Sequence, residues 1–413
     1  MKYSIVTFGC RVNQADSLRM EEDLRARGGV AVPSADAELV VVNTCSVTAS
    51  ADQGARQTIR RIARDNPSVA VIVTGCYATR QPQEVAALPK VIRVVGNHEK
   101  DWLVQSTAER FGEGDGACGA TIEPGAAGRT AFTLRVQTGC EQRCSYCIIP
   151  KTRGAGRSLP VDRVLREVER VAAAGFREIA LTGVHLGSYG RDLTPARSLG
   201  SLLHALESSP ADVTFRISSL EPMDCTPEIV DLVAGSGGRF APHLHLPLQH
   251  ASDRMLGLMR RPYTLSFYRR LVDAIVDRLP HASIGTDMIA GFPGETDDDF
   301  GANLDYLPAS PLSHVHVFPY SDRPGTDATG MPAKVPGATV RERGARLRAI
   351  CADLARRFRE SQTGTVRPGL TIEDGTLAVT DNYLKVRIPP GIERNRRIAV
   401  RLDHEAGRVV GVD

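Results

Sequence analysis

The sequence lacks the features that place a protein in or across a membrane. No apolar run approaches the ~20 residues that span a bilayer. The opening residues, MKYSIVTFGC, pass directly into a strand-like pattern and lack the basic and apolar segments of a secretory leader. Neither sign of charge is in clear excess, because the net charge is only +3 over 413 residues. We therefore expect a cytoplasmic protein without membrane contact, whose charge balance permits an RNA partner but does not diagnose one.

Aromatic residues are few, at 5%, but hydrophobic residues make up 42% of the chain and charged residues 24%, which is typical of a soluble globular protein. Chains of this length hold one core of about 200 to 250 residues plus smaller domains. We predict an N-terminal domain over 1–110, a Gly- and Ala-rich linker over 111–128, a central domain over 129–362 and a small C-terminal domain over 363–413.

The chain has nine cysteines. Cytoplasmic thiol pools keep cysteines reduced, so grouped cysteines indicate metal binding or catalysis rather than disulfides. Cys118 lies alone in the predicted linker, and Cys225 and Cys351 have no partners nearby in sequence, so we interpret these three as incidental or as buried inert thiols.

The first three apolar runs, YSIVTF, LVVVNTC and VAVIVTGC, alternate with helical stretches and predict a parallel βα sheet. A cysteine stands at the end of each run or just after it: Cys10, Cys45 and Cys76. The carboxyl ends of parallel strands share one rim, where ligands usually bind. We therefore expect these three thiols, far apart in sequence, to converge in space.

Six further strands are predicted, spaced some 30 to 40 residues apart with helices between them: FTLRVQ, EIALTGV, VTFRISSL, HLHLPLQ, SIGTDMIAG and HVHVFPY. This pattern favours a partial (β/α)6 barrel whose active face lies at the strand carboxyl ends. An Arg-rich helix over 340–362 and three short strands, which predict a small β-barrel, complete an α/β protein.

The segment GCEQRCSYC, residues 139–147, follows the first barrel strand and spaces three cysteines as CxxxCxxC: Cys140, Cys144 and Cys147. Three thiolates leave one iron of a 4Fe-4S cluster open to a small molecule. A structural zinc site needs a fourth ligand, and the next residues, IIPKTRGAGRS, supply none. The spacing therefore favours an iron-sulfur cluster.

This motif at the top of a partial barrel resembles the radical S-adenosylmethionine (SAM) superfamily. The resemblance implies that the open iron binds SAM and that one electron cleaves the sulfonium to a 5′-deoxyadenosyl radical. The segments GCRVNQADS, NTC and GCYA, which contain the first three cysteines, are similar to the N-terminal domain of the methylthiotransferase family. That similarity implies a second 4Fe-4S cluster that carries sulfur, and a C-terminal TRAM-like domain that binds RNA.

Three stretches are similar to the branch that acts on N6-threonylcarbamoyladenosine at position 37 of tRNA, namely LTGVHLGSYG, RISSLEP and DNY. One stretch, LQHAS, is more similar to the branch that modifies a ribosomal-protein aspartate. Isopentenyladenosine in tRNA is a further alternative, and a noncatalytic iron-sulfur protein is a rival of another class. The tRNA interpretation implies contact with the anticodon loop and an external electron donor. The oligomeric state stays open, with a monomer as the working expectation.

The resemblance implies two SAM molecules, one to methylate sulfur on the N-terminal cluster and one to give the radical that removes hydrogen from adenine C2. We expect Tyr146, Gly183, Ser218 and Gln249 to contact the cofactor, and we assign no catalytic side chain beyond the six cluster cysteines. His185, His243, His245, His314 and His316 are metal-ligand candidates. The last four alternate along strands, which favours packing inside the barrel.

Overall fold

The computed structural model describes residues 1–105, 122–125, 129–403 and 406–413, so Cys118 lies outside the described residues. The chain forms two compact units. The first unit comprises Met1–Ile122, Thr138–Gly156 and Ser321–Thr329, and the second comprises Glu123–Gln137, Arg157–Tyr320 and Gly330–Asp413. Each unit is described by itself below.

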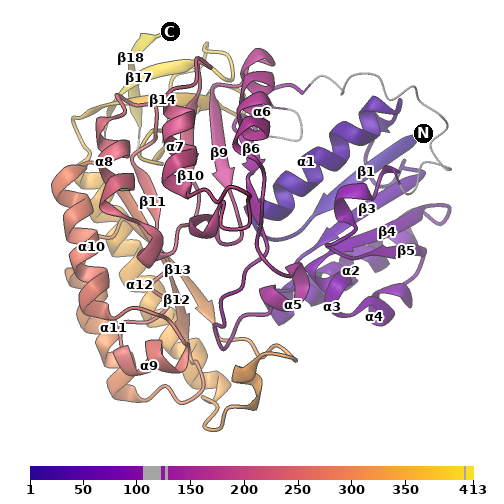
Figure 1. Cartoon of the computed structure of the whole chain (residues 1–413), viewed down its shortest axis with the longest axis horizontal. Coiled ribbons are helices and arrows are strands. Elements are labelled where there is room, and N and C mark those ends of the chain that lie inside the picture. The colour runs from indigo at the N-terminus through magenta and orange to yellow at the C-terminus, as the bar shows by residue number, and fades with distance from the viewer. Residues whose placement is uncertain (106–121, 126–128, 404–405) are drawn as a thin grey trace. The chain divides into compact units, whose positions relative to one another are not determined.

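The first unit is built on a five-stranded parallel sheet in the order β2-β1-β3-β4-β5. Its strands are β1 (Lys2–Thr7), β2 (Val30–Ala31), β3 (Leu39–Thr44), β4 (Ala70–Gly75) and β5 (Val91–Val95). Its helices are α1 (Arg11–Ala26), α2 (Ala49–Asp65), α3 (Cys76–Arg80), α4 (Pro82–Ala86), η1 (Lys100–Trp102) and α5 (Ile149–Arg153) (Figure 1). The central strand β3 is buried along its whole length, as expected for a parallel strand covered on both faces.

Two apolar clusters cover the two faces of this sheet. Val40 and Val42 point into one cluster with Ile59 of α2, and Val41 points into the other with Leu24 of α1. The predicted strands at the three cysteines are confirmed. The edge strands β2 and β5 were not predicted from the sequence, because β2 is only two residues long and much of β5 is exposed.

The second unit contains the six predicted barrel strands in two parallel sheets, ordered β10-β9-β6 and β11-β12-β13. The strands are β6 (Phe132–Arg135), β9 (Glu178–Thr182), β10 (Thr214–Ile217), β11 (His243–His245), β12 (Ser283–Ala290) and β13 (His314–Pro319). A parallel bridge between Phe215 and Phe240 connects the two sheets. The partial α/β barrel predicted from the sequence is therefore confirmed.

Helices separate these strands and form the outer layer seen in Figure 1: α6 (Val161–Ala173), α7 (Leu199–Glu207), α8 (Pro227–Gly235), α9 (Asp253–Leu258), α10 (Leu265–Arg278) and α11 (Asp297–Ala309). The long helix α12 (Gly337–Ser361) packs against β13 and leads to the C-terminal residues. The shorter elements are β7 (Gln137–Thr138), β8 (Arg157–Ser158), η4 (Leu186–Ser188), η5 (Pro222–Asp224) and η6 (Asp327–Gly330). Across the described ranges, no helix combines the length and hydrophobicity that a membrane crossing requires.

The C-terminal residues form a five-stranded antiparallel sheet in the order β16-β15-β14-β17-β18. Its strands are β14 (Val366–Ile372), β15 (Leu377–Thr380), β16 (Lys385–Arg387), β17 (Arg397–Leu402) and β18 (Gly407–Val412). A bridge from Arg387 to Ala406 brings the β16 edge to the start of β18, so the sheet curls toward a barrel around a small apolar core. The predicted small β-domain is confirmed.

Arg216 of β10 fastens this sheet to the barrel strands. Its guanidinium is 1% exposed, donates to both Glu178 carboxylate oxygens at 3.0 and 2.9 Å, and lies over the Tyr383 ring with its central carbon 5.0 Å from the centroid. It also donates to the carbonyl oxygens of Asp381 at 2.9 Å and Thr380 at 3.3 Å. Two stretches that carried the branch resemblance, RISSLEP and DNY, therefore contact each other.

Candidate functional site: two cysteine trios

The three N-terminal cysteines follow three neighbouring strands of the parallel sheet. Cys10 caps α1 shortly after β1, Cys45 comes directly after β3, and Cys76 begins α3 directly after β4. Burial raises the pKa of the Cys45 thiol to about 11, and the nearby thiols of Cys76 and Cys10 add to that rise. A bound metal would reverse this effect, because coordination deprotonates a thiol outright.

Two glycines give the loops at this rim their close approach. Gly9 has a φ of +91°, and a Cβ there would lie 2.5 Å from the Cβ and 2.7 Å from the Sγ of Cys45. Gly75 has a φ of +96°, and a Cβ there would lie 2.2 Å from the carbonyl oxygen of Thr44. Any side chain at either position would push the cysteine loops apart. The glycines before Cys10 and Cys76 are thus required by the packing of the rim.

A buried network of charges lies beneath the rim. Asp16 Oδ2 is 2.7 Å from Lys100 Nζ and 3.1 Å from Arg153 Nη2, and all three side chains are 2% exposed or less. Burial opposes the charge of Arg153, yet Asp16 and the thiols of Cys76 and Cys10 hold its pKa above the ordinary value. Two cations therefore share one carboxylate next to thiols that would be anionic as cluster ligands. This charge balance fits a thiolate-held cluster.

Asn13 and Asn97 extend this network to the cysteines. Asn13 accepts from Arg153 at 2.5 Å and donates to the carbonyl oxygen of Thr44 at 2.9 Å. Asn97 Nδ2 lies 3.6 Å from Cys76 Sγ and donates at 2.9 Å to the carbonyl oxygen of Thr152 in α5. We did not single out Asn97, Lys100 or Arg153 from the sequence, because nothing local marks a single polar residue as part of a buried network.

The second trio lies on the loop from Cys140 to Cys147, which belongs to the first unit. The loop is held by its backbone, with Cys140 N donating to Gly154 O at 3.0 Å and Cys147 N donating to Cys144 O at 3.1 Å. Its three thiols are partly exposed, and the eight cysteines of the described residues are all free. Both trios therefore belong to one compact unit, and Asn97 and Arg153 join the helix after the second trio to the residues around the first.

The chain matches two family models. Residues 2–96 match "Uncharacterized protein family UPF0004", and residues 134–307 match "Radical SAM superfamily". A protein of Aquifex aeolicus named "Threonylcarbamoyladenosine tRNA methylthiotransferase MtaB" is 36% identical, over 94% of this chain and 96% of its own. A protein of Sphingopyxis alaskensis named "tRNA-2-methylthio-N(6)-dimethylallyladenosine synthase" is 34% identical, over 88% of this chain and 84% of its own.

The chain belongs to the radical SAM methylthiotransferase family. Among solved structures, the radical SAM methyltransferase TsrM of Kitasatospora setae is similar with a TM-score of 0.57 at 16% identity, over 79% of this chain and 77% of that one. At that identity the similarity speaks for the fold alone. The radical SAM domain of this methylthiotransferase implies a 4Fe-4S cluster and SAM as cofactors.

The four expected SAM contacts of the methylthiotransferase fall in both units. Tyr146 is half-buried in the first unit. In the second unit, Ser218 follows β10, and its buried Oγ has no hydrogen-bond partner within the described residues. Gln249, after β11, has a φ of +71°, a strained conformation for a residue other than glycine. A Cβ on Gly183 would come within 3.0 Å of Gln137 Oε1.

Two histidines of this methylthiotransferase, His185 and His250, have hydrogen-bond partners within the fold. His185 Nε2 is 2.8 Å from Asp224 Oδ2. His250, in the LQHAS stretch, is fully buried between Glu295 Oε1 and Asn303 Nδ2, each 3.0 Å from its Nε2. Burial raises the pKa of Cys225 to about 12 and that of Cys351 to about 11, as expected for inert thiols.

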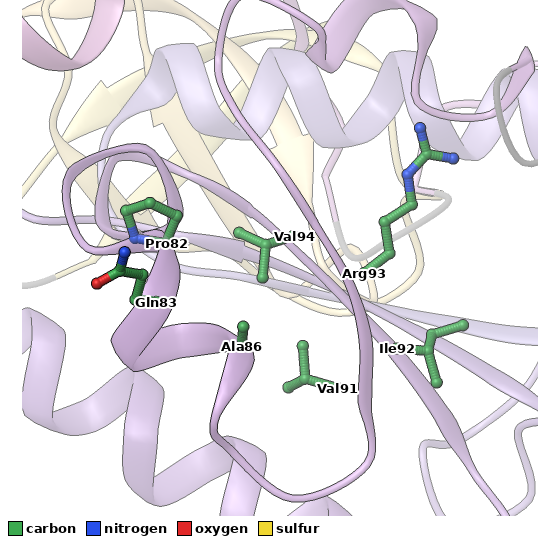
Figure 2. Close-up of a pocket in the computed structure, with 7 residues that line it drawn as sticks. All are labelled: Pro82, Gln83, Ala86, Val91, Ile92, Arg93 and Val94. Carbon is green, nitrogen blue, oxygen red and sulfur yellow. The ribbon is translucent and has the colours of Figure 1, made fainter.

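A hollow of about 360 Å³ lies between α4 and the edge strand β5 in the first unit. Figure 2 draws the residues that line it. Its lining is mostly apolar, with Val91, Ile92 and Val94 from the strand and Pro82 and Ala86 from the helix. None of the predicted cofactor or cluster residues lines it. This hollow is therefore not part of the predicted cofactor and cluster sites.

Proposed function

We propose that this enzyme converts N6-threonylcarbamoyladenosine at position 37 of tRNA into its 2-methylthio derivative. Three related proteins have that substrate in their names, and they are 34 to 36% identical to this chain over at least 92% of its length. They come from Aquifex aeolicus, Thermotoga maritima and Bacillus subtilis. The observation that carries the proposal is the presence of both cysteine trios in one compact unit, because sulfur insertion needs a radical source and a sulfur source at one substrate.

Within this proposal the second trio holds the cluster that binds SAM, and the first trio holds a second 4Fe-4S cluster. When bound, the radical cluster and SAM supply the 5′-deoxyadenosyl radical that the unactivated adenine C2 position requires. The protein's own residues position these cofactors and shield them. Lys100 and Arg153 balance thiolate charge from below, Gly9 and Gly75 let the loops close, and Asn97 ties Cys76 to α5.

Ser218 provides a test of the SAM contacts. Its hydroxyl is buried at the end of a barrel strand and, among the described residues, bonds to nothing, which favours a ligand that completes it. We expect Ser218→Ala to leave the free energy of unfolding unchanged or slightly higher, because an unsatisfied group is removed. The KM for SAM should rise about tenfold, the value of roughly one hydrogen bond. An unchanged KM together with lower stability would show that Ser218 only caps the strand.

The curled C-terminal sheet carries a candidate RNA contact. Arg401 of β17 and Arg408 of β18 are register partners, so their exposed side chains share one face. Like charges directly opposite each other are unfavourable unless an anion lies between them. Arg387 is also exposed on β16 and bridges to Ala406, two residues before Arg408. We infer that these arginines bind the tRNA backbone.

The double variant Arg401→Gln, Arg408→Gln should weaken tRNA binding at low salt. The slope of log affinity against log salt concentration should become shallower by about 1.5, because each phosphate contact contributes roughly 0.7 to 0.9. Fluorescence anisotropy with labelled tRNA measures both quantities. Arg356→Gln is the matched control, since Arg356 is exposed on α12 but paired with Glu360. An effect of equal size in the control would locate the RNA elsewhere.

The substrate is tested with reconstituted enzyme, SAM, sulfide and reductant under anaerobic conditions. Three substrates are supplied in parallel: tRNA with threonylcarbamoyladenosine, tRNA with isopentenyladenosine, and the ribosomal-protein substrate. Mass spectrometry should find a methylthio product on the first alone. A product only on one of the others would transfer the assignment to that branch. The stretch that suggested the ribosomal protein, LQHAS, has its histidine hydrogen-bonded inside the fold to Glu295 and Asn303.

A further inference from the structure

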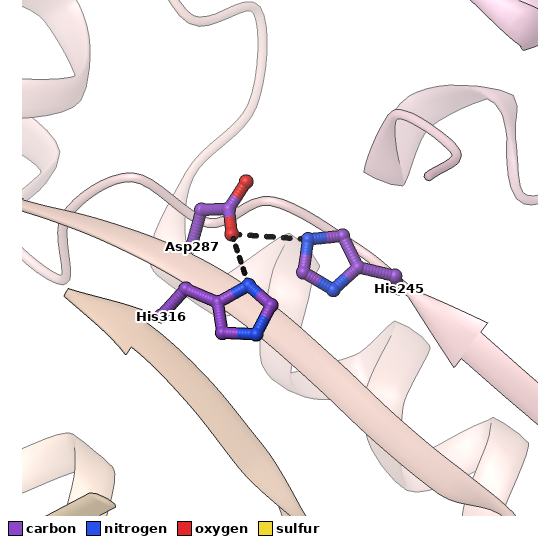
Figure 3. A group of neighbouring side chains, drawn as sticks. All are labelled: His245, Asp287 and His316. Atoms are coloured by element: carbon purple, nitrogen blue, oxygen red, sulfur yellow. Dashed lines mark ion pairs between the residues drawn. The ribbon is translucent and has the colours of Figure 1, made fainter. Parts of the chain in front are cut away.

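Three side chains from three neighbouring strands converge on one face of the second barrel sheet (Figure 3). They are His245 of β11, Asp287 of β12 and His316 of β13, where Asp287 and His316 are register partners. One ligand atom from each lies within 4.8 Å of the other two. The residue opposite His245 is Gly285, where a Cβ would lie 2.0 Å from His314 Nε2, so the sheet keeps this layer free for imidazole rings.

The carboxylate of Asp287 forms an ion pair with each of the two imidazoles, as the dashed lines in Figure 3 show. Asp287 Oδ1 is 3.1 Å from His245 Nε2 and 3.3 Å from His316 Nδ1. Even so, Oδ1 is buried and, over the described part of the chain, accepts no hydrogen bond. Nitrogen and oxygen ligands at 2.0 to 2.2 Å from a tetrahedral ion are about 3.4 Å apart. The two distances from Asp287 thus match the spacing of ligands around a shared cation, and all three ligand atoms lie within 4.8 Å of one another.

The chemistry of the ligands narrows the choice of cation. Two imidazoles and one carboxylate suit zinc or ferrous iron, whereas magnesium and calcium prefer oxygen ligands alone. The His316 side chain is 60% exposed and that of Asp287 24% exposed, so water or a substrate atom can complete the coordination. The six cluster cysteines all belong to the other compact unit and are not part of this group.

We propose that His245, Asp287 and His316 bind one divalent transition metal, zinc or ferrous iron, with an open coordination position. This site contains none of the cysteines of either trio and does not depend on the identity of the tRNA substrate. Two histidines and one carboxylate with an open position are the ligand set of metal centres that polarise or coordinate a substrate oxygen. The site would therefore take an oxygen-bearing ligand as well as the metal.

The test uses the holoenzyme with both clusters, equilibrated anaerobically with Zn²⁺ and freed of excess metal. Elemental analysis should find one zinc per chain beyond any in the matched variants. X-ray absorption at the zinc edge is not disturbed by the iron clusters, and it should show only nitrogen and oxygen neighbours. His316→Gln should weaken zinc binding by at least about tenfold, since loss of even an outer-shell partner costs 10- to 100-fold. Asp287→Asn should do the same.

His204→Gln is the matched control, because His204 lies on α7 beside Glu228 and outside the triad, and it should bind zinc as the unaltered enzyme does. His316 is exposed, so its variant should fold normally. A parallel titration with Fe²⁺, followed by Mössbauer spectroscopy, decides which metal binds more tightly. The proposal is overturned if His316→Gln and Asp287→Asn retain full zinc affinity, or if sulfur appears in the zinc shell.

Discussion

Cys144→Ala and Cys45→Ala are expected to abolish product formation in two different ways. Cys144→Ala should lose both 5′-deoxyadenosine and the methylthio nucleoside. Three thiolates bind three irons of the cluster and leave a single open iron for SAM, and the variant removes one of these thiolates. Cys45→Ala removes a thiol of the other trio, so 5′-deoxyadenosine should still form while methylthio product falls to background. Both products are quantified by mass spectrometry from the same anaerobic reaction, which separates radical generation from sulfur transfer.

Cys351→Ala is the control for this pair. Cys351 is a partly buried thiol on α12, and it should retain both products at the level of the unaltered enzyme. Iron content measured on each variant checks that one cluster remains. If Cys45→Ala still yields methylthio product at the normal rate, the N-terminal trio is not the sulfur site. If Cys144→Ala still cleaves SAM, the CxxxCxxC loop is not the radical centre.

The placement of the N-terminal cysteines was predictable because it depends on local pattern. An apolar run with a cysteine at or just after its end, repeated three times with helices between, indicates both the strands and the rim at which they end. The same reasoning located the six barrel strands. It missed β2 and β5, whose residues are too few or too exposed to show a buried-strand pattern.

Contacts between distant segments were not predictable from the sequence. Arg153 reaches Asp16 across 137 positions, and no spacing rule connects an arginine after one cysteine motif with an aspartate beside another. The histidines of β11 and β13 are a second example of a contact that a sequence pattern does not reveal. Their alternation indicated a shared face, but Asp287 lies on the strand between them and completes the triad only in three dimensions.

The residues that resembled the threonylcarbamoyladenosine branch have structural partners in the fold. Arg216 binds Glu178 and the backbone of the DNY turn, and His185 binds Asp224. Such residues set the position of the C-terminal sheet and of the loop after β9. Substitution there should change stability before it changes which nucleoside is modified.

Asp16→Asn is expected to lower the free energy of unfolding by about 3 to 5 kcal/mol, because removing one partner of a buried ion pair leaves an uncompensated charge. Asp16 is the carboxylate shared by Lys100 and Arg153, and Asn keeps its shape, so the loss reports charge alone. Urea unfolding, followed by the fluorescence of Trp102, measures this free energy. Trp102 is the single tryptophan and lies two residues from Lys100 in the chain. Asp65→Asn, on an exposed pair with Arg64, should change stability by at most about 0.5 kcal/mol.

The pH dependence of the stability of Asp16→Asn identifies which buried cation causes its loss of stability. Burial lowers the pKa of Lys100, and the Asp16 carboxylate opposes this effect, so the variant should lower that pKa further. Between the folded and unfolded pKa values the unfolded chain binds more protons, and stability therefore rises with pH. The deficit of Asp16→Asn should be largest near neutral pH and shrink as the pH rises through the lowered pKa at which Lys100 loses its proton in the folded state. A deficit that is constant with pH would attribute the loss to Arg153 alone, which stays charged throughout this range.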